Sequence, residues 1–69
     1  MTARYDASFR AGYTAGKRAR SGTRARSAYK RVSKKHGSDW IDGFLAARDV
    51  KAGAYATSAA RRAKRLGLC

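Results

Sequence analysis

The first regular feature along the chain is a set of aromatic and small residues spaced three or four positions apart. The residues with this spacing are Tyr5, Phe9, Tyr13 and Gly16. Such spacing puts them on one face of a helix of 3.6 residues per turn, the face that packs on a neighbour. Asp6 is a residue type favoured at helix starts, so we expect this helix to open near Asp6. Gly12 and Gly16, four apart, would let another helix approach closely.

Turn-forming residues interrupt the spacing at 21–23, and a second helical stretch is expected from Arg24 to Lys35. One side of it is apolar and the others are basic. His36 and Gly37 are expected to end it. Its apolar side carries Ala25, Ala28, Tyr29 and Val32.

The third expected helix is the best specified, because it holds nearly half of the large apolar residues. Ser38 or Asp39 is expected to cap it, and Gly53 to end it. A last helix is expected from Ala54 to Leu66, with Gly67 as its stop. The apolar positions of the third helix are Trp40, Ile41, Phe44, Leu45 and Ala47.

The chain has no Pro, is rich in Ala and Arg, and lacks alternating β-branched stretches, which together favour helix throughout. We expect an all-α fold, a small bundle of two to four short helices with a basic linker and a basic C-terminal tail. Residues 1–69 would form a single domain with a thin core. The core residues predicted from the helical spacing are Phe9, Gly12, Tyr13, Gly16, Trp40 and Phe44.

The strongest indication of function is the excess of positive charge. Lys and Arg number 17 against four Asp, for a net charge of +13. No acidic residue lies between Ala7 and Ser38 or after Asp49, so two basic segments flank a neutral, apolar one. Such a chain repels itself until phosphates neutralise it, and the excess of Arg favours nucleic acid. The expected nucleic-acid contacts are Lys17, Arg18, Arg20, Arg24, Arg26, Tyr29, Lys30, Arg31, Lys34, Lys35, Arg61, Arg62, Lys64 and Arg65.

Phosphate contacts do not select a sequence, so specificity would come from shape or from aromatic residues stacking on unpaired bases. Tyr13, Tyr29, Tyr55 and His36 are the candidates. For each aromatic, burial against a neighbouring helix is the simpler interpretation. Tyr29 lies among cations and is the strongest candidate.

The sequence contains no recognisable set of catalytic residues. The chain has no Glu, one His and one Cys, which is too little for a metal cluster or a Ser/His/Asp arrangement. Asp39 and Asp42 could share a Mg²⁺ ion, but acidic residues in a first helical turn are far commoner. We expect no enzyme activity, cofactor, metal, membrane contact or small-molecule substrate. The lone cysteine fits a reducing cytosol.

Two short segments carry a family resemblance. Arg10-Ala-Gly12-Tyr13-Thr-Ala-Gly16 and Trp40-Ile-Asp-Gly43-Phe44 resemble the Arg-x-Gly-Tyr-x-x-Gly and Trp-x-x-Gly-aromatic segments of the ribosome modulation factor family. The resemblance spans about residues 9–49, and residues 50–69 form a basic extension with no counterpart. The resemblance implies that Gly43 also belongs to the structural core. Ser27 and Ala28 stand where the family has Cys and Pro.

The resemblance implies a ribosome hibernation factor of a bacterial or phage-encoded cytosol that binds 16S rRNA of the small subunit near its 3′ end, with ribosomal proteins as further candidate partners. Such a protein blocks messenger engagement and promotes inactive ribosome dimers. Two alternatives remain open from the residues themselves. One is a DNA-binding accessory protein of nucleoid or mobile-element type, and the other is a small basic inhibitor of an acidic protein partner.

Overall fold

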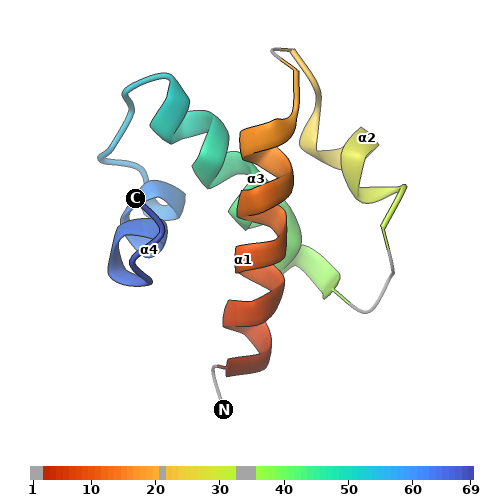
Figure 1. Ribbon diagram of the computed structural model, residues 1–69, viewed down its shortest axis with the longest axis horizontal. Coiled ribbons are helices and arrows are strands. Elements are labelled where there is room, and N and C mark those ends of the chain that lie inside the picture. The colour runs from red at the N-terminus through yellow and green to blue at the C-terminus, as the bar shows by residue number, and fades with distance from the viewer. Residues whose placement is uncertain (1–2, 21, 33–35) are drawn as a thin grey trace.

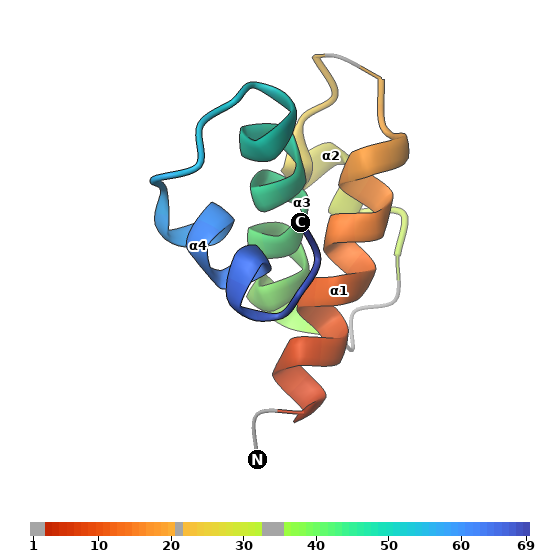
Figure 2. The same cartoon turned by 60° about the vertical axis from the view of Figure 1, so that its left-hand side comes forward.

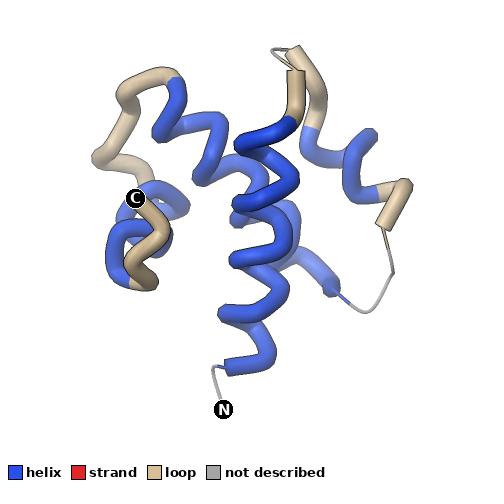
Figure 3. Tube along the Cα trace, viewed as in Figure 1, coloured by secondary structure: helices blue, strands red, loops and turns tan. Residues whose placement is uncertain are grey.

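Helices make up all the regular secondary structure that this computed structural model describes. It describes residues 3–20, 22–32 and 36–69 of the 69-residue chain. Over these ranges the fold is all-α, as expected from the sequence, and contains no strand (Figure 3). The helices are α1 (Ala3–Arg18), α2 (Ala25–Tyr29), α3 (Gly37–Lys51) and α4 (Ser58–Arg65).

The centre of the fold is a crossing of α1 and α3, the pair with the most extensive contact (Figure 1). Both α2 and α4 pack on α3, and they lie on opposite sides of the crossing (Figure 1). The C-terminal ends of α1 and α3 point to the same end of the molecule in both views (Figures 1 and 2). The basic linker and the basic tail are therefore held on different sides of one helix pair.

Glycines set how closely α1 and α3 approach. A Cβ atom on Gly12 would collide with the carbonyl oxygen of Trp40, and one on Gly43 would collide with that of Phe9. A Cβ on Gly16 would lie 2.7 Å from the Cβ of Ala47. Since only hydrogen occupies these positions, the two backbones come into direct contact. The close approach suggested by the Gly12 and Gly16 spacing is confirmed.

The core consists of two clusters that meet along α3. One joins α1, α3 and α4 through Phe9, Tyr13, Ala46, Ala47 and Ala63. The other joins α2 to α3 through Ala25, Trp40 and Phe44. All seven predicted core residues are buried. Burial, with Cys69 nearby, raises the pKa of the Tyr13 hydroxyl and keeps it neutral.

The start of α1 differs from the prediction. The helix begins at Ala3, so Asp6 lies within the first turns and does not cap it. Tyr5 is 55% exposed and does not belong to the packing face. That face therefore starts at Phe9, which is fully buried.

The second helix is much shorter than the predicted Arg24 to Lys35. It spans only Ala25–Tyr29, and its N-cap residue Arg24 makes no side-chain hydrogen bond. Five residues are too few for a helix to be stable by itself, and no acidic side chain is present for i,i+4 pairing with the cations. Burial of Ala25 against α3 holds it. The predicted contacts Lys34 and Lys35 lie outside the described residues.

The third helix begins earlier than predicted. Gly37 belongs to α3, and the N-cap is His36 without a side-chain cap. Neither Ser38 nor Asp39 caps it, because Asp39 lies inside the helix and its carboxylate accepts a hydrogen bond from Arg62. The predicted end is confirmed: Gly53 has φ of +78°, and Ala54 N–H donates to the Asp49 carbonyl in the Schellman arrangement.

The last helix begins at Ser58 and not at Ala54. Residues 52–57 turn the chain back after Gly53, and Thr57 caps α4 by accepting a hydrogen bond from Ala60 N–H. Gly67, with φ of +76°, ends α4 as predicted. Ala60 and Ala63 are buried, so the basic tail is packed onto α3 and forms part of the core.

Candidate nucleic-acid interface

Arg62 binds three of the four acidic side chains. Its guanidinium donates to the Asp39 carboxylate at 2.8 Å and lies 3.7 Å from Asp6 and 3.9 Å from Asp42. The same guanidinium stacks over the Phe9 ring at 4.4 Å from its centroid. We call Asp6, Asp39, Asp42 and Arg62 the Arg62 cluster. It fastens α4 to the N-terminal halves of α1 and α3.

Arg62 was predicted as a nucleic-acid contact, but its guanidinium is committed to contacts within the protein. Its side chain is only 21% exposed, unlike the neighbouring Arg61, Lys64 and Arg65, which are exposed. The sequence could not single out Arg62 in this basic run, because its partners come from two other helices.

The acids are thus engaged internally, while the cations face outward. The fourth acid, Asp49, accepts a hydrogen bond from the Thr57 hydroxyl at 2.8 Å. Within the described residues, every ion pair involves Arg62. Apart from Arg62, every cation whose side chain is described is exposed. The surface is therefore strongly positive.

The predicted basic residues do not form one continuous surface. Those on or beside α2 are Arg24, Arg26, Lys30 and Arg31, and those on α4 are Arg61, Lys64 and Arg65. Because α2 and α4 lie on opposite sides of the α1–α3 crossing (Figure 1), these two sets are separated. Lys17 and Arg18 end α1, and Arg20 follows it, so these three cations come just before the α2 set along the chain.

Two cations of α3 extend the positive surface beside the C-terminal end of α1. Lys51 donates to the carbonyls of Gly16 at 2.8 Å and Ala19 at 3.1 Å, which closes the C-terminal end of α1. Arg48 lies one turn earlier and is exposed. Neither residue was among the predicted contacts. Their spacing of three was the available signal, since it puts both on one helix face.

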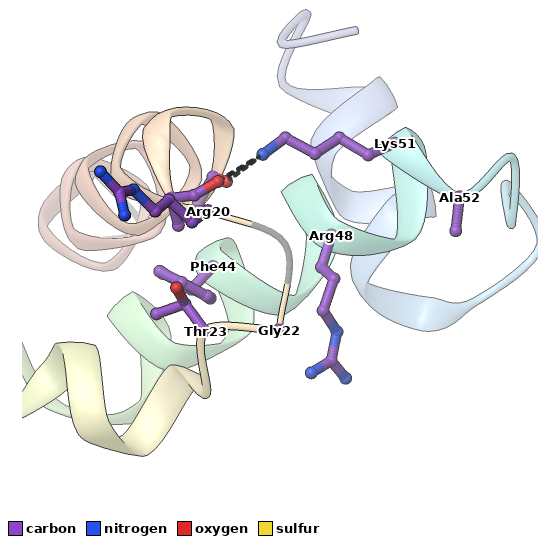
Figure 4. A pocket seen from close by; sticks show the side chains of 9 residues that line it. Arg20, Gly22, Thr23, Phe44, Arg48, Lys51 and Ala52 are labelled. Carbon is purple, nitrogen blue, oxygen red and sulfur yellow. Dashed lines mark hydrogen bonds between the residues drawn. The ribbon is translucent and has the colours of Figure 1, made fainter.

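Two neighbouring cavities lie where α1, α2 and α3 meet. The first, of about 300 Å³, is lined by Arg20, Arg48 and Lys51 around Phe44 (Figure 4). The second, of about 440 Å³, extends under α2 and is lined by Arg31, Val32 and Trp40. They share four lining residues, so we treat them as one feature, the basic groove. The shared residues are Ala19, Arg20, Thr23 and Phe44.

The aromatic candidates occupy different environments. Tyr13 is buried, and Tyr29 is half-buried with its ring 5.7 Å from that of the core residue Trp40. His36 is hydrogen-bonded to the Ser8 hydroxyl at 3.2 Å. Tyr55 is 63% exposed, so among these it is the most accessible to a base.

Other features of the described residues can be stated briefly. No group of three or more His, Cys, Asp or Glu side chains among them is placed to hold a metal ion. None of the described helices is long and apolar enough to cross a membrane. In comparisons with known proteins, no family, no curated protein and no solved structure matches the chain.

Proposed function

We propose that the chain is an RNA-binding protein that docks on 16S rRNA of the small ribosomal subunit and blocks translation by occluding that site. The observation that carries the proposal is the partition of charge. Three acids are gathered around one partly buried Arg, and the other described cations are exposed. Of the four Asp residues only Asp42 is exposed, and its carboxylate lies beside Arg62, so a polyanion would meet the other cations with little competition from carboxylates.

The physical reason is the cost of the free state. A net charge of +13 on 69 residues produces self-repulsion that the protein's own acids do not relieve. Phosphates relieve it, and the release of their counterions drives binding. An RNA backbone supplies such phosphates at high density.

The choice of ribosomal RNA depends on the family resemblance. The two segments that carry it meet at one point of the fold: Gly12 packs on the Trp40 carbonyl and Gly43 on the Phe9 carbonyl. The motif residues are thus parts of one helix crossing, which supports interpreting the two segments together. Exposed cations beside that crossing would make the contact with rRNA.

Sedimentation tests the proposal. Lysate containing the tagged protein is run on a sucrose gradient, with samples treated beforehand with RNase or DNase. We expect the protein to migrate with small subunits and to lose this association after RNase. Association that survives RNase and is lost after DNase would overturn the proposal in favour of DNA. A discrete protein complex that survives both nucleases would overturn it in favour of an inhibitor.

Matched charge removals test which side makes the contact. The first variant carries Gln at Arg26, Lys30 and Arg31 beside α2, and the second carries Gln at Arg61, Lys64 and Arg65 on α4. Each removes two Arg and one Lys, all exposed. We expect the α2 variant to lose more ribosome association, with unchanged helicity. Equal losses would indicate that net charge, not the α2 side, governs binding.

A further inference from the structure

The basic groove combines an apolar interior with a cationic rim. Phe44 and Ala19 line both of its cavities, and Val32 and Ala28 add apolar surface under α2. Arg20 also lines both cavities, with Arg31 at one and Arg48 at the other. A ligand that matches this surface has a flat apolar part and attached negative charges.

Space in the groove is preserved by three features. Gly16 and Gly22 line the first cavity without side chains. The Lys51 amine is held by the carbonyls at the end of α1. Arg20 and Arg48 lie on opposite sides of the cavity, and their guanidinium groups point away from its interior (Figure 4). Volumes of about 300 and 440 Å³ fall within the range of small-ligand sites.

We infer that the basic groove receives an unpaired nucleotide of the bound RNA. Its base enters the apolar interior beside Ala19 and Phe44, and the guanidinium of Arg20 binds the adjoining phosphate. Arg31 and Arg48, at the two cavities, take the phosphates on either side. A base inside a duplex stays stacked in its helix, so the groove selects single-stranded RNA. The inference rests on the proposed function, and it adds that the bound RNA is single-stranded.

Binding by charge alone and binding through the groove predict opposite orders of affinity for single-stranded and duplex RNA. Duplexes have the higher charge density, so a surface that recognises only phosphates binds a duplex at least as tightly as a single strand with the same number of phosphates. An abasic strand has the single strand's charge without bases. We expect the wild-type protein to bind single-stranded RNA about tenfold more tightly than either the duplex or the abasic strand.

Filling the groove provides the second arm of the test. Thr23→Leu places a larger apolar side chain in the part shared by both cavities, and Ala28→Leu fills the part under α2. The matched control Thr14→Leu adds the same side chain at an exposed position of α1. Circular dichroism reports whether each variant is folded, and two filling variants are used so that loss of folding in one leaves the other.

The measurement is fluorescence anisotropy with the three oligonucleotides. We expect the filling variants to lose the tenfold preference and keep their duplex affinity, whereas Thr14→Leu retains the preference. Equal wild-type affinity for single-stranded and abasic RNA, or a preference that persists in a folded filling variant, would overturn the inference while leaving RNA binding intact. Failure of the wild-type protein to bind any of the three would instead overturn the proposed function.

Discussion

Two glycine hydrogens determine whether α1 and α3 can cross. We expect Gly12→Ala and Gly43→Ala each to reduce the free energy of unfolding by about 3 kcal/mol, because the new methyl group meets backbone carbonyls that cannot rotate away. In a domain of this size such a loss is a large part of the total. Thermal unfolding followed by circular dichroism measures it.

Thr14→Ala is the control for these glycine variants, since Thr14 is on the same helix and exposed. Its stability should stay within about 0.5 kcal/mol of the wild type. Wild-type stability in Gly12→Ala would mean that the crossing is looser than described.

Arg62 and Arg61 are adjacent and carry the same charge, yet their expected roles differ. Arg62→Met leaves Asp6 and Asp39 without their partner, and we expect a loss of about 2 kcal/mol in unfolding free energy. Arg61→Met, at an exposed position, should change stability by less than about 0.5 kcal/mol. Denaturant titration of both variants makes the comparison, and equal stabilities would exclude a structural role for the Arg62 cluster.

The sequence predicted the core residues better than the ion pairs. Helical spacing is a local property, and it was enough to identify Phe9, Trp40 and Phe44 as interior residues. The Arg62 cluster is not local, because its acids come from α1 and α3 and its base from α4. A run of similar basic residues gives no signal of which member turns inward.

At the scale of elements, the start of α4 is fixed by a side-chain cap. Thr57 accepts a hydrogen bond from Ala60 N–H and donates one to Asp49, which ties the start of α4 to the end of α3. We expect Thr57→Ala to reduce the unfolding free energy by about 1 kcal/mol. The neighbouring Ser58→Ala, which removes a hydroxyl from the exposed first residue of α4, should have a much smaller effect. Chemical denaturation distinguishes them, and equal losses would argue against the cap.

Helix identity was predictable, but most helix boundaries were not. The apolar spacing in α1 and α3 extends over several turns, so both helices were expected, and Gly53 and Gly67 correctly marked two ends. The start of α3 could not be predicted because the carboxylate of Asp39, a favoured capping type, is used by Arg62. The short α2 reflects a run of like charges that local spacing does not take into account.

At the scale of the whole molecule, the Arg62 cluster and the cations beside the basic groove lie towards opposite ends of the two central helices. Asp6 and Asp39 lie in the N-terminal turns of α1 and α3, whereas Lys17, Arg48 and Lys51 lie towards their C-terminal ends. Helix dipoles favour this arrangement at both ends. Because α1 and α3 end on the same side of the molecule (Figure 2), their cations gather beside the basic groove.

The sequence predicted the amount of charge but not its placement. Two basic segments were evident from the absence of acids, yet nothing in the spacing showed that α2 and α4 lie on opposite sides of α3. The groove likewise depends on three helices meeting, and its residues Arg20, Thr23 and Arg48 come from two distant segments. Surfaces of this kind can be recognised only when the arrangement of the helices in space is known.

The central claim is that the exposed cations bind the RNA backbone, and the salt dependence of affinity tests it most directly. Fluorescence anisotropy with purified protein and a single-stranded RNA oligonucleotide gives the dissociation constant over a range of salt concentrations. With about six phosphate contacts, the logarithm of the association constant should fall against the logarithm of salt concentration with a slope of about −4. Absence of binding in dilute buffer, or an affinity indifferent to salt, would contradict the account.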